Sequence, residues 1–232
     1  MSAKGRKPKD LRKTLDGIWW ILCTGSMWNQ LPSRYGKWNS VWRCYRRWCA
    51  SGMWNDLLLK LANEFEEVEK LRIVDASHCK CHQDAARSPQ SAEDHKFGKT
   101  KGGRNTKISA VVNSEGRAVG LLLVPGNQHD SKSARVTLGD IDGAKVLGDK
   151  AYDVDELRNQ IVAGGGQPNI PPKKNRKNPA PYDKELGKRR SLVENFFCRI
   201  KSYRRVATRY DKLAETYMGF VTLSAIADWI RI

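Results

Sequence analysis

The stretch Leu71-Arg72-Ile73-Val74-Asp75-Ala76 is a short β-prone run, and the character of the chain changes where it begins. Two more β-prone runs follow, at 107–112 and 118–124. The polar residues 113–116 between them, Asn-Ser-Glu-Gly, are typical of a hairpin turn. We therefore predict a first strand over 71–76, followed by a β-hairpin.

Helices and strands alternate after the hairpin. We expect a helix over 130–138, a strand over 145–148 that ends at Asp149, a helix over 154–163, a strand over 168–171 and a long amphipathic helix from Lys188. Residues 172–187 form a basic, proline-containing loop. This order predicts an α/β fold, a mixed sheet with flanking helices of the ribonuclease-H-like kind.

The first third of the chain differs in composition from the rest. It holds seven of the eight tryptophans, interleaved with basic residues. Its pattern predicts three helices separated by turns, over 11–23, 39–50 and 54–65. An acidic run, Glu64 to Glu69, follows them and marks the expected boundary. We expect a small helical, helix-turn-helix-like domain over 1–68 and an α/β domain over 69–232.

Charge is the dominant feature of the composition. The 232 residues include 42 Lys and Arg against 25 Asp and Glu, a net charge of +17. Such a surplus is typical of proteins that bind nucleic acid. The apolar runs are shorter than the roughly 18 to 20 residues that a membrane span needs, and no signal peptide is evident. We expect a cytoplasmic protein that has reduced cysteines and does not enter a membrane.

The positive charge is concentrated in two places. Segment 171–212 holds 14 Lys and Arg and four acids, which is +10 of the net charge of +17. We expect it to be the main phosphate-contacting surface, with Lys173, Lys174 and Arg176 among the contacts. A second, sequence-reading surface is expected on the helix that carries Arg43, Arg46 and Arg47.

Three carboxylates are candidates for chemistry. Asp75 lies within an apolar strand, Asp149 ends another, and Glu194 lies in the first turns of the last predicted helix. A buried acid has to be paired or to bind a metal ion, because an unpaired buried charge is unstable. Simpler roles remain open for each: a solvated strand end for Asp75, a turn for Asp149 and an ion pair with Arg190 for Glu194.

The predicted helix around Glu194 has a cationic face. At about 100° per residue, one side gathers Arg190, Glu194, Cys198, Lys201 and Arg205, while apolar residues fill the other side. A surface helix held by salt bridges would mix acids and bases in comparable numbers. One acid among three cations instead indicates a face directed at phosphates.

Three motifs together resemble one family. They are Val74-Asp75-Ala76-Ser77, Leu147-Gly148-Asp149-Lys150-Ala151-Tyr152-Asp153 and the 190–201 stretch in which Arg190, Glu194 and Lys201 have RxxxExxxxxxK spacing. They resemble the DDE transposases of bacterial insertion sequences, in particular group five within the IS-four-like superfamily. The likeness extends over nearly the whole chain, and the helical N-terminus is similar to the family's DNA-binding segment.

The resemblance implies a mechanism. Asp75, Asp149 and Glu194 would hold two Mg²⁺ ions, with Mn²⁺ as an expected substitute, while Arg190 and Lys201 contact DNA phosphates. Water would free a 3′-hydroxyl at the element end, and that hydroxyl would attack target DNA. The implied partners are double-stranded DNA, at element ends and target site, and further copies of the chain in a homo-oligomer on DNA.

Two departures from the family leave alternatives open. Gly187 stands where the family has a tyrosine, and the family has further residues before the basic start, so a shortened N-terminus is expected. The chain would then be a decayed copy that binds DNA as an inhibitor; a metal-dependent nuclease is a further alternative. The histidines and cysteines between His78 and His82 could suggest a zinc site, but we expect a loop there. His129 and Asp130 could suggest catalysis, but we expect Asp130 to be a helix N-cap.

Overall fold

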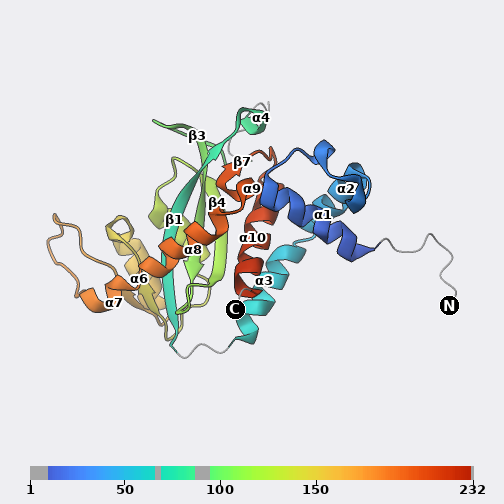
Figure 1. Cartoon of the computed structure of the whole chain (residues 1–232). Helices are drawn as coiled ribbons and strands as arrows, with labels where there is room; N and C mark the ends of the chain where they lie inside the picture. Colours follow the sequence, from blue (N-terminus) through green and yellow to red (C-terminus); the bar gives the residue numbers. More distant parts are fainter. Residues whose placement is uncertain (1–9, 66–68, 87–94, 231–232) are drawn as a thin grey trace.

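The computed structural model describes residues 10–65, 69–86 and 95–230 (Figure 1). Within them lies one mixed sheet, formed by β1 (Leu71–Cys81), β2 (Gly98–Thr100), β3 (Gly103–Val112), β4 (Ala118–Pro125), β5 (Lys145–Leu147), β6 (Gln167–Asn169) and β7 (Thr208–Arg209). Its main order is β4-β3-β1-β5-β6. β5 and β6 run parallel to β1, whereas β3 is antiparallel to both β1 and β4. This is the predicted ribonuclease-H-like arrangement, and the predicted hairpin joins β3 to β4.

Helices cover both faces of the sheet. α8 (Ser191–Lys201) and α10 (Ala214–Ile230) pack on one face, and α5 (Asp130–Thr137) and α6 (Asp155–Ala163) on the other. The sequence fits both layers because successive strand residues point to opposite faces. Ile73 joins the core under α8 and α10, while its neighbour Val74 joins the core under α5 and α6.

The N-terminal region is helical, as predicted, with α1 (Leu11–Thr24), α2 (Trp38–Ala50) and α3 (Met53–Glu64). It packs against α10 on the side away from the sheet (Figure 1). Tyr45 of α2 stacks on Phe220 of α10 at 4.5 Å between ring centroids, and its hydroxyl donates to the carbonyl of Thr216 at 2.6 Å. These helices therefore share one hydrophobic core with the sheet. The expected boundary at residue 68 lies outside the described residues.

The C-terminal half differs from the sequence prediction. The single helix expected from Lys188 is instead α7 (Lys184–Lys188), α8 and α9 (Arg204–Ala207), and α10 follows. A break at Ser202 and Tyr203 separates α8 from α9. The described cysteines are all free thiols, and no helix in the described ranges is long and apolar enough to cross a membrane.

Candidate active site

Asp75 and Asp149 belong to neighbouring parallel strands. β1 and β5 are paired with Ile73 opposite Leu147, so the two acids follow that pair at the same distance along the chain. β5 ends at Leu147, and Asp149 caps the short 3₁₀ turn η3 (Lys150–Tyr152) by accepting from the Ala151 amide at 2.8 Å. Both acids thus lie where the two strands separate, at the carboxyl end of β5, which is the usual ligand-binding edge of such sheets.

Burial and neighbouring charges act on Asp75. Burial raises the pKa of its carboxyl group above the ordinary value, and the charges of Asp149 and Asp130 raise it further. The Ala76 amide, which donates to Asp75 at 2.8 Å, and the Arg190 guanidinium lower the pKa but do not cancel the effect. Asp75 and Asp149 are partly buried and repel one another, and their carboxylates are the hard oxygen ligands that a divalent cation prefers.

Glu194 is connected to these acids through Arg190. It lies in the first turn of α8 with its side chain 59% exposed, and Arg190 Nη2 is 3.6 Å from its Oε1. Arg190 also lowers the pKa of Asp75, and its buried Nε has no hydrogen-bond partner among the described residues. The structure therefore brings Asp75 and Asp149 together but holds Glu194 in an ion pair. Within the described ranges, no three acidic, histidine or cysteine side chains gather as one metal site.

A fourth carboxylate, Asp130, lies near the first two. The sequence predicts it as a helix N-cap, but the structure gives that place to His129, whose Nδ1 accepts from the Ser131 amide. Asp130 begins α5, and its Oδ1 is 2.5 Å from Nζ of Lys107, a buried lysine of β3. Sequence reasoning missed this pair because its members are far apart in the chain. The sequence does offer one signal: Lys107 lies in a β-prone run, and a lysine buried in a strand requires an acidic partner.

Lys201 fastens α8 to β1. Its Nζ donates to Ser77 Oγ at 2.5 Å and to the carbonyl of His78 at 2.9 Å. These contacts hold the helix of Glu194 over the strand of Asp75. The sequence predicts that the Lys201 ammonium group contacts DNA phosphates, but here it donates to these two β1 oxygens.

The prediction that Arg205 faces DNA is wrong. The helix breaks after Lys201, so the predicted face does not continue to residue 205. Arg205 is 5% exposed and donates from Nε and Nη2 to the two carboxylate oxygens of Asp211, each at 3.0 Å. Its role in this structure is to hold α9 in place.

The basic loop after β6 is anchored through Arg176. The Arg176 guanidinium donates to Asp153 at 3.0 Å and pairs with Asp155, and the amide of Lys173 also donates to Asp153. Burial opposes ionisation of Asp153, but the hydrogen bonds from Arg176, the Lys173 amide and Arg158 outweigh it and lower its pKa to about 2. Arg176 thus fixes the loop, contrary to the expectation that it is free for phosphate. Lys174 is exposed.

The expected loop at residues 78–82 is instead the continuation of β1, which ends at Cys81. Along a strand, neighbouring side chains point to opposite faces. Cys79 is accordingly buried in the core, while His78 contacts Asn105 of β3. The residues of this cluster are therefore spread over two faces of the sheet.

Gly187 has an aromatic neighbour. A Cβ atom built on Gly187 would lie 1.9 Å from the hydroxyl oxygen of Tyr182. The Tyr182 ring therefore occupies the space into which a side chain at position 187 would extend. Any larger residue at 187 requires the end of this tyrosine to move.

A ribonuclease-H-like sheet with acids at the ends of adjacent strands is the arrangement of enzymes that cut and join nucleic-acid strands with divalent ions. The family model "Transposase DDE domain" matches residues 66–227, and a second model, "Putative transposase of IS4/5 family", matches residues 1–58. The chain belongs to the DDE transposase family. Family membership makes it a polynucleotidyl transferase that depends on a divalent metal ion.

The chain is also similar to individual proteins. "Putative transposase for insertion sequence element IS6501" of Brucella ovis is 34% identical over 128 residues, which are 54% of this chain and 98% of that protein. A 16.2 kDa protein of insertion element IS402 from Burkholderia cepacia is 37% identical over 79 residues, 32% of this chain and 54% of that protein. Among solved structures, the Mos1 transposase paired-end complex matches with 10% identity and a TM-score of 0.30, over 94% of this chain and 82% of that one.

Proposed function

We propose that this transposase binds the ends of its own insertion element and uses Asp75, Asp149 and Glu194 to cleave and join DNA strands. The observation that carries the proposal is the juxtaposition of Asp75 and Asp149 at the point where β1 and β5 separate. In this proposal, residues 69–232 are the catalytic part, and residues 1–68 recognise DNA. The protein acts as a homo-oligomer on chromosomal DNA, in the cytoplasm.

Asp75 and Asp149 fit a divalent ion because they offer adjacent hard oxygen ligands, as Mg²⁺ prefers. Bound ions, two Mg²⁺ in this proposal with Mn²⁺ as a substitute, would activate the attacking oxygen and stabilise the leaving one. Glu194 completes the ligand set when its pair with Arg190 opens. Arg190 is then available for a phosphate, which a guanidinium binds in two-point geometry.

Lys201 keeps α8 docked on β1 while this exchange takes place. Water is the first nucleophile and frees a 3′-hydroxyl at the element end. That hydroxyl is the second nucleophile: it attacks a phosphorus atom of target DNA, forms a new phosphodiester bond and displaces the 3′-oxygen of the target strand, which leaves as a 3′-hydroxyl. The chain itself supplies position and charge, and no covalent link between protein and DNA is required.

The test is strand cleavage in Mg²⁺ or Mn²⁺ on duplexes taken from the DNA that flanks this chain's coding sequence. Glu194→Gln, Asp75→Asn and Asp149→Asn should each reduce cleavage by roughly a thousandfold or more, because residues that act as a unit do not contribute additively. Duplex binding, followed by gel shift, should persist. Glu185→Gln is the matched control, since Glu185 is an exposed acid of α7 paired with Lys188.

One observation favours a second function, that of a DNA-binding inhibitor. Gly187 lacks the tyrosine that the family motif predicts, and the Tyr182 ring takes up the adjoining space. If the unmodified chain binds flanking DNA specifically but cleaves it with neither metal ion, the inhibitor function is correct. Gly187→Tyr, alone and with Tyr182→Ala, then tests whether the defect lies at this position.

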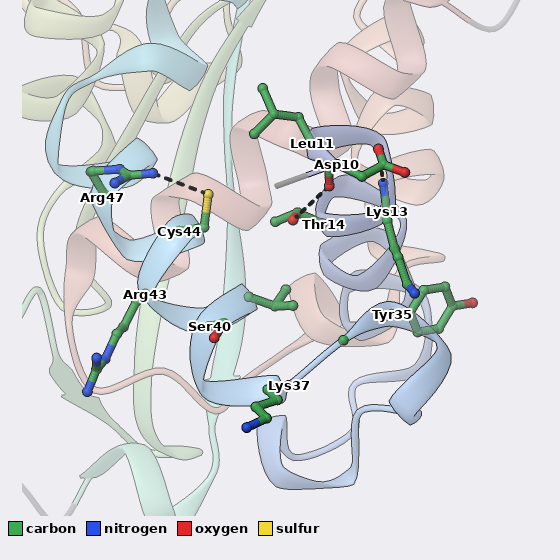
Figure 2. A pocket seen from close by; sticks show the side chains of 12 residues that line it. Asp10, Leu11, Lys13, Thr14, Tyr35, Lys37, Ser40, Arg43, Cys44 and Arg47 are labelled. Atoms are coloured by element: carbon green, nitrogen blue, oxygen red, sulfur yellow. Dashed lines mark hydrogen bonds between the residues drawn. The ribbon is translucent and has the colours of Figure 1, made fainter. Parts of the chain in front are cut away.

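The N-terminal helices offer a concave basic surface for DNA. A groove of about 730 Å³ lies between the start of α1 and one side of α2, and Figure 2 shows Lys37, Arg43 and Arg47 around it. Lys13 lines it from α1, and Asp10 is the one acid among its lining residues. Arg43, Arg46 and Arg47 are all exposed, but Arg46 does not line the groove. We infer that the groove binds the phosphate backbone of duplex DNA, with Lys173 and Lys174 of the basic loop as a second contact.

The salt dependence of duplex binding tests the groove. Each neutralised phosphate contributes about −0.9 to the slope of log affinity against log salt concentration. Arg43→Ala with Arg47→Ala should therefore make the slope less negative by roughly 2. Arg46→Ala, on the same helix but outside the groove, is the matched control and should leave the slope unchanged. Equal slopes for all three proteins would show that the groove does not bind DNA.

A further inference from the structure

Tyr152 is a buried residue beside the proposed active site that no step above uses. It lies in η3, three residues after Asp149, and its side chain is 1% exposed. The ring packs with Val74 and Val111 in the core under α5 and α6. It also lies against Gly148, where a Cβ atom would be 3.1 Å from the ring.

The hydroxyl of Tyr152 has no hydrogen-bond partner within the described part of the chain. Buried hydroxyl groups are nearly always paired, so an unpaired one requires an explanation, such as a ligand, water or ion that completes it. Packing alone does not explain it, since phenylalanine would fill the same space without burying a polar atom.

The charges of three carboxylates act on the Tyr152 hydroxyl. Burial raises the pKa of Tyr152 above its ordinary value, and the charges of Asp75, Asp130 and Asp149 raise it further, with Arg190 opposing them. The hydroxyl therefore stays protonated and can act only as a donor toward this cluster. η3 packs against α5, the helix that begins with Asp130, so the tyrosine lies between that helix and the end of β5.

The neighbouring carboxylates already have other donors. Asp75 accepts from the Ala76 amide, Asp149 from the Ala151 amide, and Asp130 from Lys107. β1 pairs with β5 at residues 71–73 and with β7 at Lys80 and Cys81. Asp75 therefore lies on the part of β1 between these two ladders.

We propose that the Tyr152 hydroxyl donates a hydrogen bond in the metal site. Its acceptor is an oxygen ligand that enters the site together with the divalent ion. This inference rests on the proposed function of Asp75 and Asp149. The oxygen belongs either to water around the ion or to a DNA phosphate. In both cases Tyr152 orients a ligand of the ion and strengthens its binding.

Tyr152→Phe removes only the hydroxyl group and tests the proposal on the full-length chain. In EDTA, the melting temperature should stay the same or rise, because no native hydrogen bond is lost. Mn²⁺ affinity, measured by calorimetry and by electron paramagnetic resonance of free Mn²⁺, should fall by about tenfold or more, as for other residues that orient metal ligands. A loss seen with Mn²⁺ alone identifies water as the acceptor, and one seen only with duplex DNA identifies a phosphate oxygen.

Tyr217→Phe is the matched control, because that buried hydroxyl donates to the carbonyl of Val206 at 2.7 Å. It should lower the melting temperature and leave Mn²⁺ affinity unchanged. The inference is overturned if Tyr152→Phe behaves in the same way, or if its Mn²⁺ affinity equals that of the unmodified chain with and without DNA while Asp149→Asn loses Mn²⁺. If Asp149→Asn retains full affinity, the proposed metal site itself is wrong, and this inference falls with it.

Discussion

Segment 171–212 and helix α2 both concentrate arginines, but the structure uses the two groups differently. In segment 171–212, Arg176 pairs with Asp153, Arg199 with Asp228 and Arg205 with Asp211. Arg209 is fully buried. In α2, by contrast, Arg43, Arg46 and Arg47 are exposed to solvent.

The difference shows why the net charge of a segment does not identify a DNA-binding surface. Asp153 and Asp228, the partners of Arg176 and Arg199, lie outside segment 171–212, so its charge count omits them. Pairing with a buried carboxylate makes such arginines part of the fold, because the buried acid requires its partner. The cations that segment 171–212 exposes are mainly lysines, among them Lys174, Lys177, Lys184 and Lys212.

The largest expected effect comes from removing a buried arginine of segment 171–212. Arg205→Ala leaves Asp211 buried without its partner and should lower the free energy of unfolding by about 3 to 5 kcal/mol. Urea denaturation measures this. Arg204→Ala, at the exposed neighbouring position, should change it by no more than about 0.5 kcal/mol. Equal effects of the two substitutions would remove the distinction between paired and exposed arginines.

Asp153, which holds the basic loop, should have a smaller and pH-dependent effect on the free energy of unfolding. Asp153 has a pKa of about 2 in the folded chain against an ordinary value of 3.8. Its contribution to the free energy of unfolding is therefore complete at pH values above 3.8 and is lost as the pH falls toward 2. The free energy of unfolding should decrease over this range by no more than about 2 kcal/mol through this group. Asp153→Asn should lack that part of the decrease, as followed by urea midpoints between pH 6 and pH 2.5. Parallel curves for both proteins would contradict the anchoring role.

The smallest expected effect concerns the one acid of the N-terminal groove, Asp10. Asp10 lines the groove and caps α1 by accepting from the amides of Arg12 and Lys13. Asp10→Ser keeps a capping oxygen and removes the charge, so duplex affinity should rise by roughly twofold, as expected for an exposed charge interaction below about 1 kcal/mol. Asp56→Asn makes the same change of charge on α3 outside the groove and should have less effect. Equal gains would reflect net charge alone.

The sequence predicts those parts of the fold that have a simple period. The alternating cores around Ile73 and Val74, the hairpin and the amphipathic helices α1 to α3 follow the predicted pattern. α10 has no such signal, because residues over most of its length are buried on every side and no polar stripe marks it. The break after Lys201 depends on tertiary contacts of α9, and residue spacing does not record them.

The candidate site is predictable to a similar extent. Asp75 and Asp149 stand out as acids in or after apolar runs, and the structure places them side by side. The pair of Lys107 with Asp130 and the unpaired hydroxyl of Tyr152 could not be found in the same way. Both depend on which distant segments meet, which a local pattern does not specify.

Locating the bound metal ion tests whether Asp75 and Asp149 form the metal site. Fe²⁺ in place of Mg²⁺, with ascorbate and peroxide, produces hydroxyl radicals that cut the polypeptide close to the ion. If Asp75 and Asp149 hold the ion, the polypeptide is cut next to these two residues, excess Mg²⁺ suppresses the cuts and Asp149→Asn abolishes them. Cuts confined to other parts of the chain, or cuts at these positions that Mg²⁺ does not suppress, would contradict this placement of the ion.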